Sequence, residues 1–374
     1  MARVSVEVDA AICVRCAACS ILAPRVFEVT RKGSRVVREP ADGEHAAVAA
    51  AALACPTQAI RMQGAPTTAT AGGAASAAGA STPEATAGGA ASAAGASTMN
   101  DVVGEALYYR LFDEAERVRW RVEDVPWDRI DRERAGPGLR ALVRATAYSE
   151  LTTTTATRRF LTDLGDDVDF TQWLAVWFYE ESKHPQVLLR WLHRVGETVD
   201  EQFMRKGRAT APFMRSRMGT LVTNIISEMV ASAAYARMHA TSTEPVLAGI
   251  GRNLAADEAR HAASFYAYAR RHLERSRDLD ADRRDAVKVL YLWFSDNERV
   301  SHPVNEFYAR HDAGDGVGDA ANRPDFEGTA PRDRIIRLIG TLVDLPLTGE
   351  TDLLAVVRDL GGERTTKEAH HEAT

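Results

Sequence analysis

Four cysteines, all placed before residue 60, offer the first chemistry in this sequence. Cys13, Cys16 and Cys19 follow one another at two successive C-x-x-C spacings, and Cys55 is followed directly by Pro56. Three thiolates on one short loop can bind three iron corners of a cubane, and a distant Cys-Pro closes the fourth. Zinc also takes four thiolates, but its ligands usually come as two separated C-x-x-C pairs. The pattern therefore favours a [4Fe-4S] cluster.

Two Glu-x-x-His units form a second group of residues suited to metal chemistry. They are Glu181 with His184, and Glu258 with His261. Residues three apart on a helix are neighbours, so a Glu and a His at this spacing can bind one ion together. One unit alone is more typical of a solvated helix face. It is the pair that indicates a metal site.

A di-iron site also needs one carboxylate from each of two further helices. Glu150 is in phase with Leu142 and Val143, and Glu228 is in phase with Leu221. Burying carboxylates on apolar faces is costly unless cations neutralise them. Four glutamates and two neutral imidazoles balance two ferrous ions, and this oxygen-rich set suits iron or manganese better than zinc. The predicted ligands are Glu150, Glu181, His184, Glu228, Glu258 and His261.

A low-complexity segment separates the two groups. Residues 65–98 are almost wholly Ala, Gly, Ser and Thr, and the string ATAGGAASAAGAST occurs in them twice. Such a segment has nothing to bury, so we expect a flexible linker that lets the first part approach the second and leave again. The predicted domains are therefore residues 1–64 and residues 99–374.

The pattern of hydrophobic residues differs on the two sides of this linker. Strand-like pieces at Arg3–Val8, Val26–Val29 and Arg35–Val37, with an Ala-rich helix at His45–Ala54, predict a small α+β module. After the linker, apolar residues recur three and four apart, which predicts an all-α helix bundle. The expected helices cover residues 139–161, 170–192, 221–238, 247–268 and 285–294. Pro185, directly after a predicted ligand, predicts a kink or an early helix end.

The composition of the chain argues against a nucleic-acid-binding, membrane or secreted protein. The formal net charge of -6 shows no basic excess of the kind that nucleic-acid binding requires. We find no apolar run long enough to span a bilayer and no secretory leader, so we expect a cytoplasmic protein without membrane contact. A reducing compartment also favours metal binding by the cysteines over disulfides.

Two segments of the module resemble a known family. VDAAICVRCAACSILAPRVFEV and ACPTQAIRM are similar to the single-cluster bacterial ferredoxins, and the resemblance covers nearly all of residues 1–64. It implies a carrier of single electrons that is itself reduced by a ferredoxin reductase.

The bundle resembles a second family, the soluble acyl-acyl-carrier-protein desaturases of the ferritin-like superfamily. WFYEESKH is similar to the family's EENRH segment and NLAADEARHAASFY to its AADEKRHE segment, within a resemblance over most of residues 130–275. The resemblance implies a ferritin-like di-iron bundle, the six ligands named above, and Asp257 as an acidic partner of a ligand histidine. The sequence departs from the family at Ala231, with Ser232 beside it, where many members have threonine.

These parts together predict an enzyme that uses O2 and electrons from its own ferredoxin module to desaturate a carrier-bound acyl chain in fatty acid metabolism. The alternative is a di-iron monooxygenase, a hydroxylase or N-oxygenase, that acts on a specialised small molecule. A third reading is iron storage with a redox module. The oligomeric state stays open, with a homodimer among the options.

Further residues bear on the substrate. An acyl carrier protein could dock on a basic run, and three tryptophans are expected to pack in the core rather than line an acyl channel. The basic run comprises Arg205, Lys206, Arg208, Arg215 and Arg217, and the tryptophans are Trp173, Trp177 and Trp191.

Overall fold

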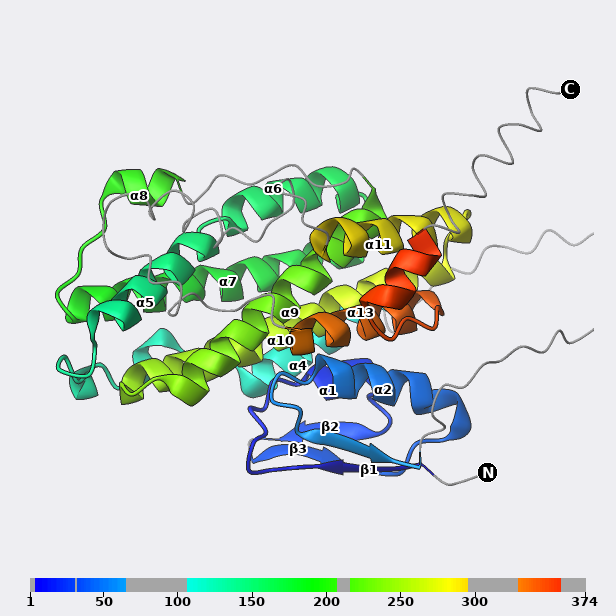
Figure 1. Cartoon of the computed structure of the whole chain (residues 1–374), viewed down its shortest axis with the longest axis horizontal. Helices are drawn as coiled ribbons and strands as arrows, with labels where there is room; N and C mark the ends of the chain where they lie inside the picture. Colours follow the sequence, from blue (N-terminus) through cyan, green and yellow to red (C-terminus); the bar gives the residue numbers. More distant parts are fainter. Residues whose placement is uncertain (1–3, 31, 65–105, 207–215, 295–328, 358–374) are drawn as a thin grey trace, which may run out of the picture.

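The computed structural model describes residues 4–30, 32–64, 106–206, 216–294 and 329–357. It has two parts, a small α+β module at residues 4–64 and a predominantly helical region after it, as the sequence predicts (Figure 1). The predicted linker at 65–98 lies outside the described residues.

Two antiparallel strand pairs and two helices build the module. Strand β1 pairs with β4, from Ser5 opposite Gln63 to Val8 opposite Ile60, and β2 pairs with β3. The helices cover one side of these strands (Figure 1). The elements are β1 (Ser5–Val8), α1 (Ala18–Leu22), β2 (Phe27–Thr30), β3 (Gly33–Val36), α2 (His45–Ala54) and β4 (Ile60–Gln63). The sequence predicted three of the strands and α2, but neither α1 nor β4.

Long helices make up the second part. They run side by side, and α9 and α10 form a hairpin in contact along their length (Figure 1). The helices are α4 (Leu107–Val118), α5 (Pro137–Glu150), α6 (Thr153–Leu164), α7 (Val168–Arg194), α8 (Glu201–Lys206), α9 (Arg217–Thr241), α10 (Pro245–Glu274), α11 (Leu279–Phe294) and α13 (Thr329–Val343).

The chain breaks the helix expected over residues 139–161 directly after Glu150. The amides of Leu151 and Thr152 bond to carbonyls three residues back, and the Thr152 hydroxyl donates to the Ser149 carbonyl at 2.9 Å. Threonine hydroxyls compete with the helical ladder in this way, and β-branched side chains weaken it further. The break places Glu150 at a helix end, between α5 and α6.

Of the two outcomes predicted at Pro185, a kink or an early helix end, the structure excludes the early end. Helix α7 continues past this residue to Arg194. Side chains on the following turns are fully buried, among them Val187, Leu188 and Trp191. Their burial outweighs the single hydrogen bond that the proline removes.

The module packs directly against the bundle. Its helix α1 contacts α10 and α4, and α2 contacts α13 and α10. Val14, Ile21 and Ala54 of the module belong to the same hydrophobic core as residues of the bundle. In this structure the module is therefore in contact with the bundle.

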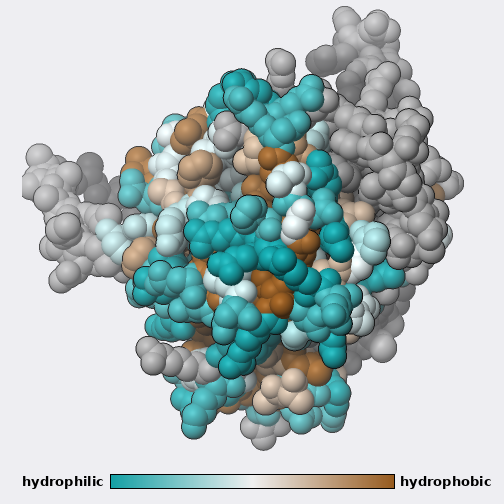
Figure 2. Space-filling model, turned by 90° about the vertical axis from the view of Figure 1, so that its left-hand side faces the viewer, coloured by the Kyte–Doolittle hydropathy of each residue, from teal (hydrophilic) through white to brown (hydrophobic). Residues whose placement is uncertain are grey.

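Figure 2 views the molecule from the end where α8 and the start of α5 lie. Hydrophobic residues appear there as small islands among hydrophilic ones. None of the described helices is both long enough and apolar enough to cross a lipid bilayer.

Candidate metal centres

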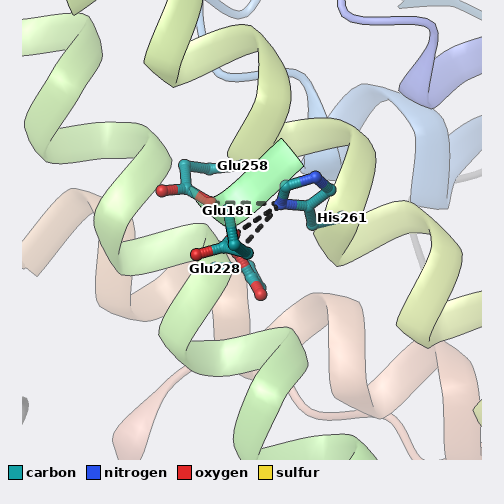
Figure 3. Close-up of side chains that lie close together, drawn as sticks. All are labelled: Glu181, Glu228, Glu258 and His261. Carbon is teal, nitrogen blue, oxygen red and sulfur yellow. Dashed lines mark hydrogen bonds and ion pairs between the residues drawn. The ribbon is translucent and has the colours of Figure 1, made fainter. Parts of the chain in front are cut away.

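The predicted ligands of the bundle converge from four helices. Glu150 ends α5, Glu228 comes from the middle of α9, and α7 and α10 each supply one Glu-x-x-His unit. Their side-chain donor atoms form two groups, each with all its atoms within 4.8 Å of one another. One group is Glu181, Glu228, Glu258 and His261 (Figure 3), and the other is Glu150, His184 and Glu258. Glu258 belongs to both groups, so the two sites are adjacent.

Each imidazole turns its Nδ1 atom toward the carboxylates. His261 Nδ1 lies 2.9 Å from Glu181 Oε1, and His184 Nδ1 lies 3.3 Å from Glu258 Oε1. His184 Nδ1 is also 3.4 Å from Glu150 Oε2. Among the described residues this nitrogen has no hydrogen-bond partner of good geometry. A neutral imidazole that is bonded through Nε2 offers the lone pair of Nδ1 to a metal, so the arrangement fits a metal ligand.

Burial makes the charge of these carboxylates costly. It raises the pKa of Glu228 to about 8, with a further contribution from the nearby charge of Glu258. It also raises the pKa of Glu150, although His184 opposes that shift. For His184, burial lowers the pKa of the imidazole, but the carboxylates of Glu258 and Glu181 outweigh it and raise this pKa well above its ordinary value. Divalent cations between these groups would remove the cost.

Neighbouring side chains orient the carboxylates. Trp177 Nε1 donates to Glu228 Oε1 at 3.0 Å, and the phenol of Tyr235 donates to Glu150 Oε1. The Thr153 hydroxyl lies 3.2 Å from Glu181 Oε2 but is closer to the Glu150 carbonyl, at 2.8 Å. Buried donors thereby orient the carboxylates of Glu228 and Glu150.

A second carboxylate lies behind each imidazole. Asp257 Oδ2 is 3.3 Å from Nε2 of His184, as expected for an acidic partner of a ligand histidine. Glu180 Oε2 is 3.1 Å from Nε2 of His261. Arg260 joins the two acids, at 2.6 Å from Asp257 and 3.0 Å from Glu180.

The negative charge of both outer acids is stabilised despite their burial. Burial opposes their charge, but Arg260 lowers the pKa of Glu180 to about 2 and holds the pKa of Asp257 well below its usual range. A carboxylate in this place fixes the imidazole and makes it a stronger metal ligand. Sequence reasoning missed Glu180. A signal for it exists, because it stands directly before Glu181 as Asp257 stands before Glu258.

The remaining residues singled out in the sequence are the three tryptophans and the basic run. The three tryptophans are buried in the core, as expected, with the Trp191 indole donating to Glu244. Arg205 and Arg217 form ion pairs with Glu201 and Asp166. The side chains of the remaining members of the basic run, Lys206, Arg208 and Arg215, lie outside the described residues.

The four cysteines converge in the module. Cys13, Cys16 and Cys19 lie in and after the loop that leads into α1, and Cys55 directly follows α2. Burial raises the pKa of the Cys16 thiol, and the nearby Cys55 and Cys19 raise it further. All four thiols are free of disulfides.

The loop that contains Cys13 and Cys16 has two residues with left-handed backbone conformations. Arg15 and Ala17 adopt left-handed conformations with φ of 61° and 66°. Such a conformation costs about 1–2 kcal/mol at a residue other than glycine, and strain of this kind collects where a loop clamps a ligand. The Ala59 amide also donates to Cys55 Sγ at 3.3 Å. Backbone N–H groups directed at cysteine sulfur are a feature of iron–sulfur sites.

Residues 8–62 match the family model of the 4Fe-4S single cluster domain of Ferredoxin I. The N-terminal module is a ferredoxin-type [4Fe-4S] domain. A comparison of the chain with curated proteins gave no match. The four cysteines, three from a strained loop and one beside a proline, fit this cluster.

The ferredoxin module lies close to the bundle centre. Its Pro56 lines a small cavity of about 10 Å³ together with Met229 of α9 and Ala259 of α10. Met229 and Ala259 directly follow the predicted ligands Glu228 and Glu258 in the sequence. The loop of the fourth cysteine therefore shares a cavity with residues that directly follow two predicted ligands in the sequence.

A larger cleft of about 370 Å³ lies between the ferredoxin module and the bundle. It is lined by Val14 and Arg15 of the ferredoxin module and by Trp120 and Asp257 of the bundle, among others. The Trp120 indole donates to Asp257 Oδ2 at 2.8 Å, and Asp257 in turn contacts His184. A chain of hydrogen bonds thus runs from the cleft to a predicted ligand.

Proposed function

We propose that this chain is an O2-dependent oxidoreductase in which the ferredoxin module passes electrons to a di-iron centre in the bundle. The observation that carries the proposal is the convergence of two matching units, each an acid followed by Glu-x-x-His, from α7 and α10. Four inner carboxylates and two imidazoles balance two ferrous ions in charge and match their preference for oxygen and nitrogen.

The chain would contribute position and charge. A reduced pair of irons bound here would supply the activation of O2, which amino-acid side chains alone do not provide. Glu181 and Glu258 would both help to hold the metal, because the carboxylate of each lies within 3.8 Å of both imidazoles. Glu180 and Asp257 would hold those imidazoles with Nδ1 toward the metal.

Two contacts support electron delivery from the ferredoxin module. The first is the close packing of Pro56 against residues next to the ligands, and the second is the hydrogen-bonded series Trp120, Asp257 and His184. The module supplies one electron at a time, and returning a ferric pair to the ferrous state takes two. A ferredoxin reductase would refill the cluster between transfers.

For the substrate we propose an acyl chain on an acyl carrier protein, which the enzyme would desaturate. This step rests on the similarity of WFYEESKH and NLAADEARHAASFY to the desaturases. The test is the intact mass of acyl-loaded carrier proteins after incubation with iron-reconstituted protein, O2, NADPH and ferredoxin reductase. Loss of two hydrogens supports desaturation, and an unchanged mass while the protein consumes oxygen contradicts the carrier-bound substrate.

One observation favours the second candidate, a monooxygenase. Ala231 takes the place of the threonine found in many desaturases, and the neighbouring Ser232 donates its hydroxyl to the Ala255 carbonyl at 2.8 Å. This hydroxyl is therefore committed to the backbone and does not replace the threonine. Gain of one oxygen atom in the same assay would support a hydroxylase or N-oxygenase.

A further inference from the structure

Arg334 of helix α13 lies beside a ligand of the ferredoxin cluster, although it belongs to the bundle. Its Nη2 donates to the carbonyls of Cys55 at 2.6 Å and of Leu53 at 2.7 Å. These carbonyls lie at the C-terminal end of α2, where a helix leaves carbonyl groups without partners and where positive charge is stabilising. The contact therefore docks the module and also brings a cation to the cluster.

The charge of opposite sign that acts on Arg334 is that of Cys55. Burial lowers the pKa of the Arg334 guanidinium and the nearby Arg337 lowers it further, while the Cys55 thiol acts in the opposite direction. Within the described part of the chain, no carboxylate forms an ion pair with Arg334. The electrostatic effect of this cation is thus available to the cluster.

Arg110 of helix α4 makes a similar contact with the other helix of the module. Its Nη1 donates to the Ile21 carbonyl of the module at 2.7 Å. Burial lowers the pKa of its guanidinium, and the nearby groups that raise it are Glu114 and Tyr268 rather than a cysteine. Arg110 therefore provides a matched comparison, an arginine that docks the module but has another charge partner.

We propose that Arg334 raises the reduction potential of the ferredoxin cluster, and that it does so only while the module is docked on the bundle. Reduction adds one electron to a cluster that already carries four thiolates. A fixed positive charge beside one of them stabilises this more negative state more than the oxidised state. The cluster is thus easier to reduce at the place where it stands next to its acceptor.

Docking and reduction are then coupled in both directions. If docking favours the reduced cluster by some factor, reduction strengthens docking by the same factor. The module would be held more tightly while it carries an electron and less tightly after it has passed the electron on. This inference concerns the cluster alone, so it stands or falls separately from the oxygen chemistry proposed for the bundle.

The first experiment is a redox titration of the cluster-loaded full chain, followed by electron paramagnetic resonance of the reduced cluster. For Arg334→Gln we expect the ratio of reduced to oxidised cluster at a fixed potential to fall about tenfold, which is about 59 mV for a one-electron couple. Arg334→Lys keeps the charge and should recover most of the potential, and Arg110→Gln should match the unaltered protein. An unchanged potential in Arg334→Gln, or an equal fall in Arg110→Gln, would overturn the proposal.

The second measurement is hydrogen exchange of the α2 amides, with and without dithionite. In the unaltered protein and in Arg110→Gln, reduction should slow this exchange, because docking tightens. In Arg334→Gln the difference between the two redox states should disappear. A difference that persists undiminished in Arg334→Gln would show that another group couples docking to reduction.

Discussion

The candidate centre in the bundle has two halves, one supplied by α7 and one by α10. The two halves have the same types of inner ligand, but different side chains contact their outer acids. Helix α7 supplies acid, Glu and His at residues 180, 181 and 184, and α10 supplies the same series at residues 257, 258 and 261. The outer acid of α10, Asp257, bonds to the indole of Trp120. The outer acid of α7, Glu180, has the guanidinium of Arg119 at 3.4 Å instead.

This difference is expected to affect electron delivery but not metal binding. The duplicated ligands are what a pair of ions requires, so neither half is expected to bind metal better. Trp120 and Arg119 both line the cleft beside the ferredoxin module. An aromatic ring can pass an electron, whereas a guanidinium only sets the local charge. We therefore expect electrons to enter on the side of Asp257 and His184.

The largest effect should come from removing the residue that both halves share. Glu258→Ala deletes a carboxylate from each group of ligands, so the bundle should lose its metal and its turnover. The cluster should keep its absorption spectrum, because its four cysteines are untouched. The measurement is iron content per chain together with the visible spectrum.

Cys16→Ser is the matching change in the ferredoxin module. It should damage the cluster and leave the metal of the bundle in place. An active Glu258→Ala variant with undiminished bundle iron would contradict the assignment of the ligands.

A pair of smaller changes tests the comparison itself. Asp257→Asn and Glu180→Gln each replace the outer carboxylate of one half by an amide of similar shape. Both should weaken metal binding about 10- to 100-fold, because each imidazole loses the charge that orients it. Competition with a chelator measures this affinity. Only Asp257→Asn should also slow reoxidation of the cluster by the bundle, measured by stopped-flow absorbance.

The sequence was enough to predict which six side chains of the bundle converge, because their signal is local. Glu-x-x-His spacing puts both groups on one helix face, and the apolar stripe tells which way that face points. Glu228 and Glu150 followed from the same phase argument. The ferredoxin module also has a local signal, because Cys13, Cys16 and Cys19 are close in sequence, and its family match covers residues 8–62.

The sequence was not enough for groups that meet only in the folded chain. The contact of Glu180 with His261 requires that α7 and α10 face each other at one particular depth. The contact of Arg334 with Cys55 joins residues 279 positions apart. The helix break after Glu150 depends on whether threonine hydroxyls bond to the backbone, which residue type alone does not decide. Long-range packing and local competition for hydrogen bonds set these features.

Acidification should weaken metal binding in both halves. Burial raises the pKa of Glu228 to about 8, so below this pH in the metal-free protein its carboxyl holds a proton that a metal must displace. Burial also raises the pKa of Glu150, which acts in the same direction. Below pH 8, affinity should fall about tenfold per pH unit for each proton displaced. Metal titrations between pH 6 and pH 9 measure this slope.

The variant Glu228→Gln is the control, since it binds metal less well but has one carboxyl fewer to titrate. Its slope should be lower by about one proton. A slope equal to that of the unaltered protein would show that other groups release the protons.

The smallest expected effect belongs to Trp120, and it bears most directly on the route of the electrons. Trp120→Phe removes the indole N–H that donates to Asp257 but keeps an aromatic ring in the cleft. Electron passage from cluster to bundle should slow several-fold, while metal content stays unchanged, because the imidazole of His184 still contacts Asp257. Trp127→Phe is the matched control, since that indole donates to the Val122 carbonyl instead. Equal rates in the two variants would leave the packing of Pro56 against α9 and α10 as the route that the electrons take.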